Sequence, residues 1–220
     1  VMKNIVIASP HSLHDQLEIE LGVTFTVTRI KSREALTAEY LKALNPSYVF
    51  FPHWSWIIPD EILTDFQCVI FHMTDLPYGR GGSPLQNLIV RGKKATVISA
   101  IKCVKELDAG PIYLKMPLTL DGTAKEILDR ASTVIQQMIF KIVEGCGELK
   151  DQLGDVVSFK RRVSDDGDLL HLETTNQIYD YIRMLDADNY PCAFIEIDNF
   201  RLEFTSAKHV GETVEAVVKF

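Results

Sequence analysis

His72 and Asp108 are the two residues whose types and positions point most directly to chemistry. His72 ends the apolar run 68–71, and Asp108 follows a second apolar run, 96–104. The loop between them is rich in glycine, which lets a backbone and a substrate approach each other closely. An open sheet gathers its functional groups at the carboxyl ends of its strands, so we predict that these two side chains meet.

A histidine and an aspartate in contact can move a proton during a reaction. The imidazole titrates near neutral pH, and the carboxylate can orient the ring or receive protons through water. Each residue alone has an ordinary explanation, because His72 can be a hydrogen-bonded core residue and Asp108 with Gly110 can be a simple turn. Their combination favours a catalytic pair.

His53 is a third polar residue at the end of a predicted strand, 48–53. Trp54 and Trp56 follow it and either form a slot for a flat heterocycle or anchor the core. The two explanations have equal weight at Trp54.

The elements that position these residues alternate between strand and helix patterns. Short apolar runs at 3–8, 24–29, 48–53, 68–72, 96–104 and 111–118 predict strands, and a long apolar stripe over 124–143 predicts a packed helix. This order predicts an α/β fold, a Rossmann-like and mostly parallel sheet with helices on both faces. The first strand is followed by Ser9, Pro10 and His11 rather than by a glycine-rich dinucleotide fingerprint.

The pattern changes after residue 150, which predicts a catalytic domain over 1–150 and a small C-terminal α+β domain over 151–220. A helix pattern over 174–185 precedes two strands, 193–197 and 200–205, joined at Asp198 and Asn199 as a hairpin. The hairpin is a candidate contact for a homodimer, although it can equally pair within its own domain.

The bulk composition favours a soluble intracellular protein that does not bind nucleic acid. The 220 residues carry a formal net charge of −7, whereas phosphate binding needs clustered cations. The basic run 160–162 is more simply a solvated strand end. The four cysteines are widely spaced, so we predict neither a metal site nor disulfides, and no membrane-spanning segment is visible. We therefore expect a cytoplasmic protein.

A family resemblance rests on the string His72-x-x-x-Leu-Pro-x-x-Arg-Gly-x-x-Pro-x-Gln. It resembles the signature loop of the 10-formyltetrahydrofolate-dependent formyltransferases, and the turn at 107–110 resembles their Leu-Asp-x-Gly turn. The segment 178–194 resembles their small C-terminal domain. The resemblance implies N10-formyltetrahydrofolate as formyl donor and an amine as acceptor. The implied catalytic residues are His72 and Asp108.

The resemblance also implies the residues that bind the folate. They lie in two segments: Trp56, Ile57 and Ile58, and Val104, Lys105, Glu106 and Leu107.

One position departs from the family pattern. Family members carry an asparagine two residues before the histidine, where its amide helps to hold the developing oxyanion, and this chain has Ile70. Such a donor is typically worth about 3 kcal/mol, so its loss calls for a substitute. We predict His53 in that role.

The acceptor is predicted to be a nucleotide-linked amino sugar, a UDP- or dTDP-4-amino-4,6-dideoxyhexose of surface-polysaccharide biosynthesis. Acidity and the small C-terminal domain argue against tRNA. The predicted contacts to the sugar nucleotide are Ser9, Pro10, His11, Tyr78, Gly79 and Arg80. The alternatives are a methionyl-tRNA formyltransferase, a non-catalytic folate or nucleotide-sugar binding protein of the same fold, and a hydrolase that releases formate.

Overall fold

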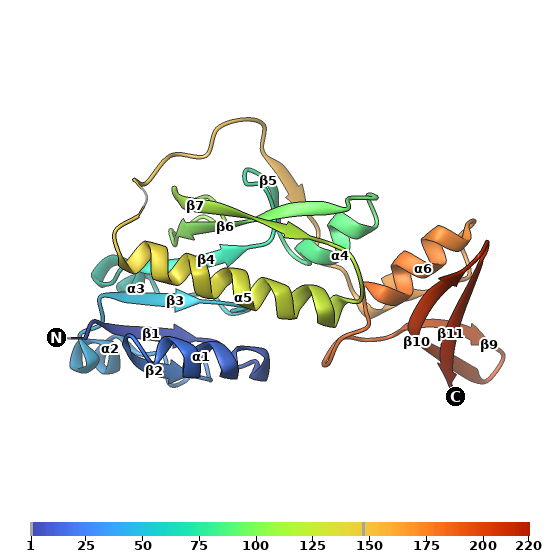
Figure 1. Ribbon diagram of the computed structural model, residues 1–220, viewed down its shortest axis with the longest axis horizontal. Helices are drawn as coiled ribbons and strands as arrows, with labels where there is room; N and C mark the ends of the chain where they lie inside the picture. The colour runs from blue at the N-terminus through green and yellow to red at the C-terminus, as the bar shows by residue number, and fades with distance from the viewer. Residues whose placement is uncertain (1, 147) are drawn as a thin grey trace. The chain divides into compact units, whose positions relative to one another are not determined.

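The computed structural model describes residues 2–146 and 148–220 (Figure 1). The chain forms two compact units, each assembled from segments that are distant in the sequence. Unit 1 comprises Val1–Arg80, Val97–Leu118 and Asp129–Ser158, and unit 2 comprises Gly81–Thr96, Thr119–Leu128 and Phe159–Phe220. The division at residue 150 stays a prediction.

A six-stranded sheet carries the predicted site (Figure 1). Its strands, in spatial order, are β2 (Thr26–Ile30), β1 (Asn4–Ala8), β3 (Tyr48–Phe51), β4 (Cys68–His72), β6 (Ala95–Lys102) and β7 (Ile112–Thr119). The first four pair in parallel, as the alternating pattern predicts. The apolar runs of β1, β3 and β4 are buried on both faces, which is typical of a parallel sheet between helices, whereas the edge strand β2 is partly exposed.

Helices cover both faces of the sheet (Figure 1). On one face lie α1 (Asp15–Leu21), which follows the short 3-10 helix η1 (Ser12–His14), and the long helix α5 (Ala124–Val143). On the other face lie α2 (Ala38–Leu44) and α3 (Asp60–Asp65). Alternate residues of β3, Val49 and Phe51, pack with α2 and α3 in one buried cluster.

Unit 2 contains the C-terminal elements. The helix α6 (Thr175–Arg183) packs on an antiparallel sheet of β9 (Ala193–Ile197), β10 (Phe200–Val210) and β11 (Thr213–Lys219). The predicted hairpin is therefore present, and it pairs with a third strand, β11, that the sequence did not indicate. Unit 2 also holds α4 (Pro84–Ile89) and the 3-10 helix η2 (Ser164–Gly167). The dimer contact stays a prediction.

The predicted fold class is confirmed by these elements. A two-stranded sheet of β5 (Tyr78–Gly81) and β8 (Val157–Phe159) accompanies the main sheet. In the part of the chain that the structure describes, no helix has the length and apolarity needed to cross a membrane.

Candidate active site

His72 is the last residue of β4, and only 7% of its surface is exposed. Its Nε2 lies 2.7 Å from the carbonyl oxygen of Gly79. A carbonyl oxygen only accepts hydrogen bonds, so Nε2 carries a hydrogen and donates it. The lone pair of the neutral ring is then on Nδ1, which becomes the one basic nitrogen of His72.

The carboxylate of Asp108 faces that basic nitrogen. Its Oδ2 lies 3.7 Å from Nδ1 of His72, and both side chains are buried. This separation exceeds a direct hydrogen bond, yet a carboxylate this close stabilises an imidazolium ion. The structure thus brings the two predicted catalytic residues together.

The path by which Asp108 reaches His72 differs from the prediction. Asp108 does not end a strand, because β6 ends at Lys102 and β7 begins at Ile112. In addition, β6 runs antiparallel to β4, with Ser99 opposite His72, so the end of β6 leads away from the imidazole. The loop 103–111 therefore has to turn back toward His72. The apolar pattern of β6 does not reveal that this strand runs antiparallel to β4.

Gly110 allows this loop to turn tightly. A Cβ atom at this position would lie 1.7 Å from the carbonyl oxygen of Lys102. Asp108, two residues earlier, has a φ of 52°, a left-handed conformation that aspartate adopts more readily than most residues. The turn therefore requires glycine at position 110, because the carbonyl oxygen of Lys102 occupies the space that a side chain would need.

Gln152 holds this turn from a third segment. Its Nε2 donates to the carbonyl oxygens of Asp108 at 2.7 Å and Gly110 at 2.9 Å. Its Oε1 accepts from Arg80, at 3.1 Å from Nε and 2.8 Å from Nη2. Arg80 also pairs with Glu106 at 3.4 Å. Sequence reasoning missed Gln152, because no local motif marks it.

Hydroxyl groups support the loop after β4. Ser99 donates to the carbonyl oxygen of Thr74 at 2.7 Å. Thr74 in turn donates at 3.4 Å to the Gly79 carbonyl that also accepts from His72. These contacts fix the acceptor that selects the tautomer of His72.

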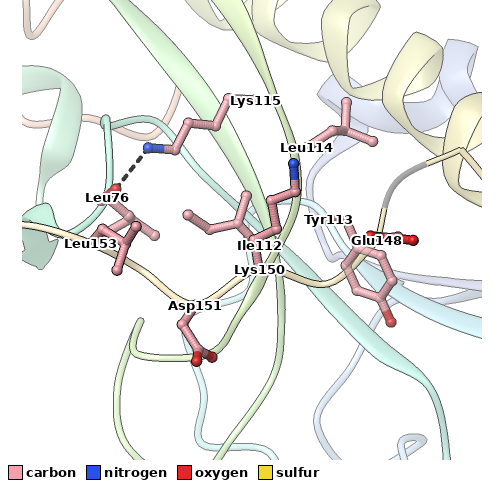
Figure 2. Close-up of a pocket in the computed structure, with 9 residues that line it drawn as sticks. All are labelled: Leu76, Ile112, Tyr113, Leu114, Lys115, Glu148, Lys150, Asp151 and Leu153. Carbon is pink, nitrogen blue, oxygen red and sulfur yellow. Dashed lines mark hydrogen bonds between the residues drawn. The ribbon is translucent and has the colours of Figure 1, made fainter.

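A pocket of about 380 Å³ lies beside this loop (Figure 2). Its lining residues are Leu76, Ile112, Tyr113, Leu114, Lys115, Glu148, Lys150, Asp151 and Leu153. Lys115 crosses one end and donates to the carbonyl oxygen of Leu76 at 2.7 Å (Figure 2).

His53 follows β3, and its ring is directed toward His14. Nδ1 of His53 lies 2.9 Å from Nε2 of His14, whose Nδ1 lies 3.0 Å from the Ser132 hydroxyl on α5. Burial, and secondarily the charge on His11, lowers the pKa of His53 to about 4. Burial, followed by the charges on His53, Arg29 and His11, lowers the pKa of His14 to about 2. Both rings are therefore neutral at physiological pH.

The loop of Ser9, Pro10 and His11 is organised by one guanidinium group. Arg29 donates to the carbonyl oxygens of Ser9, His11 and His14 at 2.8–2.9 Å. Burial, and secondarily the charge of Arg29, lowers the pKa of His11.

Within the described residues, no three His, Cys, Asp or Glu side chains are arranged to hold a metal ion.

The two predicted folate segments lie in loops tied to each other. Lys105 pairs with Asp60 at 3.0 Å, which links the loop after β6 to the start of α3. The first segment exposes Trp56 and Ile57, and the second exposes Val104 and Leu107. Four exposed apolar side chains on two joined loops suit packing against the faces of a flat ring system.

Ile70 is partly buried and packs against the cluster under α2 and α3. Its side chain has no hydrogen-bonding atom, so it does not replace the amide of an asparagine. Since Nδ1 of His53 bonds to His14, only Nε2 of His53 can take that role. The substitution by His53 stays a prediction.

Comparison with known proteins identifies the family. Residues 9–143 match the family described as Formyl transferase, and residues 164–220 match the domain described as Methionyl-tRNA formyltransferase, C-terminal domain. The chain belongs to the formyl transferase family.

Several relatives of this chain are named as methionyl-tRNA formyltransferases. A methionyl-tRNA formyltransferase structure from Clostridium thermocellum is 44% identical, with a TM-score of 0.94 over 99% of this chain and 98% of that one. A methionyl-tRNA formyltransferase of Thermotoga maritima is 30% identical over 56% of this chain and 41% of its own length. The chain spans 41–58% of the length of the first curated relatives it matches.

More distant structures share the fold. A likely sugar N-formyltransferase from Mycobacterium tuberculosis is 17% identical, with a TM-score of 0.71 over 93% of this chain and 97% of that one. HypX from Aquifex aeolicus in complex with tetrahydrofolic acid is 16% identical, with a TM-score of 0.76 over 92% of this chain and 37% of that one.

These matches correct the predicted acceptor. The amino-sugar acceptor, and the exclusion of a nucleic-acid partner, are wrong, because the 44% identical structure and the C-terminal match both belong to methionyl-tRNA formyltransferases. Net charge misled us because it averages over the whole surface. The contacts to a sugar nucleotide that were predicted for residues 9–11 and 78–80 depended on that acceptor, so we no longer assign these residues to a sugar nucleotide.

Proposed function

We propose that this protein transfers a formyl group from N10-formyltetrahydrofolate to the amino group of methionyl-tRNA. The observation that carries the proposal is the match to the Clostridium thermocellum methionyl-tRNA formyltransferase, 44% identical over 99% of the chain. The C-terminal residues 164–220 support the same acceptor through their own family match.

A cluster of cations in unit 2 supports a phosphate-bearing acceptor. We call it the basic cluster: Arg91, Lys93, Lys94, Lys160, Arg161 and Arg162. Asn87 joins its two segments, because its side chain donates to the Lys160 carbonyl at 2.9 Å and accepts from Arg91 at 2.9 Å. Arg91 also lies 4.5 Å from the ring of Phe159. Such a local concentration of positive charge binds a phosphate backbone even when the whole chain is acidic.

In this proposal His72 accepts a proton from the attacking amine. The nitrogen of the amine has to lose a proton when it bonds to the formyl carbon. The bond from that carbon to N10 breaks in return, and N10 of the departing tetrahydrofolate gains a proton. Nδ1 of His72 is the basic nitrogen, since Nε2 donates to Gly79. The carboxylate of Asp108, 3.7 Å from Nδ1, stabilises the imidazolium that results.

The formyl donor would be held by the two joined loops at 56–58 and 104–107. Their exposed apolar side chains suit its ring, and the fold neighbour HypX was solved with tetrahydrofolic acid. When bound, the donor supplies a one-carbon unit already activated for transfer to nitrogen. The buried position of His72 and Asp108 keeps bulk water from the reacting groups.

An acceptor comparison tests the proposal. The purified protein is given N10-formyltetrahydrofolate with initiator methionyl-tRNA or with UDP- and dTDP-linked amino sugars, and products are weighed by mass spectrometry. We expect a formyl adduct on the methionine of the tRNA and none on the sugars.

The variants His72→Asn and Asp108→Ala serve as controls. Both should bind the donor and formylate the amine far more slowly than wild type, because only the proton-transfer pair is changed. Full turnover in either variant contradicts the assigned roles. Absence of turnover with every acceptor favours the non-catalytic alternative that Ile70 suggests, and formate release without acceptor favours the hydrolase.

A further inference from the structure

We propose that Gln152 is a positioning residue of this transferase. Its side chain holds two backbone segments, one on either side of the His72 imidazole, at a fixed separation, and we call these segments the two walls. One wall is β5, where Gly79 accepts from Nε2 of His72. The other is the turn that presents Asp108 to Nδ1. The inference rests on the proposed function for its kinetic consequence, whereas its geometry is independent of the acceptor.

The four hydrogen bonds of Gln152 fix the orientation of its amide. Arg80 has only donors, so the atom that faces it must be the carbonyl oxygen of the amide. The backbone carbonyls of Asp108 and Gly110 only accept, so the atom that faces them must be the amide nitrogen. Both hydrogens of that nitrogen and both lone pairs of the oxygen are used. A flipped amide would face four like groups, so one rotamer is strongly preferred.

The segment that carries Gln152 is itself anchored. Lys150 and Ile112 exchange backbone hydrogen bonds of 2.7 and 3.0 Å, which attach the segment to β7. The neighbours Asp151 and Leu153 line the pocket of Figure 2, whereas Gln152 between them bonds to Arg80 and the Asp108 turn. Lys150 also lines this pocket, so Gln152 is the one residue of 150–153 that does not. The anchor at Lys150 lies two residues before Gln152 and holds the segment that presents its amide to the Asp108 turn.

The bridge links Arg80 to Asp108 through a single side chain. Arg80 follows Gly79 directly, so the guanidinium and the acceptor of His72 belong to the same strand. Without Gln152, the carbonyls of Asp108 and Gly110 lose this donor, and Arg80 keeps only its exposed ion pair with Glu106 at 3.4 Å. That single long contact holds the Asp108 turn to β5 less tightly, and displacements of about 1 Å around reacting groups can cost on the order of 100-fold in rate.

The test combines kinetics with a signal that needs no substrate. Gln152→Met keeps length and volume but removes all four hydrogen bonds, and Gln152→Glu keeps the Arg80 contact but removes the donors to the turn. We expect either change to lower kcat by about 10- to 100-fold with KM nearly unchanged, because positioning rather than binding is lost. In an Asp108→Ala background the same changes should lower kcat by about twofold or less, since the group they position is absent. The neighbouring Asp151→Asn variant should behave as wild type.

The second readout is the nitrogen NMR spectrum of the His72 ring in histidine-labelled, ligand-free protein. We expect the Nδ1 signal to shift in Gln152→Met and to stay in place in Asp151→Asn, at unchanged melting temperature. An unchanged His72 signal, or an equal loss of kcat with and without Asp108, overturns the proposal. If wild-type protein formylates no acceptor, the proposed function fails, and the NMR comparison still decides the role of Gln152.

Discussion

His14 shows how a buried polar residue shapes this site without touching the predicted catalytic pair. It has no exposed surface, and it connects Ser132 on α5 to His53 after β3. A folded-state pKa of about 2 means that the ring stays neutral while the same histidine in an unfolded chain titrates near 6.5. The hydrogen bonds from His14 to Ser132 and His53 therefore belong to a folded state in which the His14 ring carries no charge.

This residue predicts a pH dependence of stability. Below about pH 6.5 the unfolded chain binds a proton at His14 that the folded protein does not, so the free energy of unfolding falls as pH decreases. The contribution approaches about 1.4 kcal/mol per pH unit. Denaturant unfolding between pH 7.5 and 5 should show a smaller slope for His14→Gln than for wild type. The exposed His171→Gln variant is the control, and an unchanged slope in His14→Gln contradicts the prediction.

Residue types and local spacing were enough to predict that His72 and Asp108 lie together, because each lies beside a recognisable loop. They were not enough for Gln152 or His14. Gln152 bonds to a residue 44 positions away, and His14 to one 118 positions away. Such contacts depend on how the elements fold together, and a lone glutamine or histidine carries no local sign of them.

The loop between β6 and β7 illustrates the same limit at the scale of elements. Periodicity correctly predicted the strands of the six-stranded sheet and the long helix α5, since burial on one or two faces leaves a repeating pattern. It did not show that β6 runs antiparallel to β4, because an apolar run reads alike in either direction. The return of Asp108 to His72 therefore depends on the loop and on its tight turn at Gly110.

Replacing Gly110 should disrupt this loop. In Gly110→Ala the new methyl group would overlap the Lys102 carbonyl, so the backbone must shift. We expect a loss of about 2–3 kcal/mol in the free energy of unfolding, measured with denaturant, together with reduced formylation.

Gly145→Ala separates this contact from backbone strain alone. Gly145 has a φ of 86° but open space around its Cβ direction, so its replacement should cost about 1–2 kcal/mol and leave activity intact. Equal activity losses in both variants would contradict a specific role for the Gly110 turn.

At the scale of the whole molecule, charge distribution matters more than net charge. The chain carries a formal charge of −7, yet six cations gather on two adjacent segments of unit 2. Composition led us to exclude nucleic acid, and only the contacts of Asn87 showed that the two basic segments adjoin. In the proposed function, recognition of the acceptor depends on this adjacency, which no short motif encodes.

The basic cluster predicts how tRNA binding responds to salt. Lys160→Ala combined with Arg161→Ala should raise KM for methionyl-tRNA and leave kcat nearly unchanged. The slope of log KM against log salt should fall by about one for each phosphate contact removed. Lys42→Ala, which removes an exposed lysine paired with Asp65, is the matched control. Equal slopes for wild type and the double variant would exclude the cluster as the tRNA surface.

The hydrogen bond from Nε2 of His72 to Gly79 has a further consequence for turnover. An imidazole with both nitrogens open can pass a proton through the ring, taking it up on one side and releasing it on the other. Here the hydrogen bond to Gly79 occupies Nε2, so a proton that binds at Nδ1 has to leave from the same atom. In the proposed reaction His72 therefore cannot pass its proton to solvent through Nε2 while the reactants are bound. The next catalytic cycle begins only after Nδ1, which faces Asp108, has released its proton.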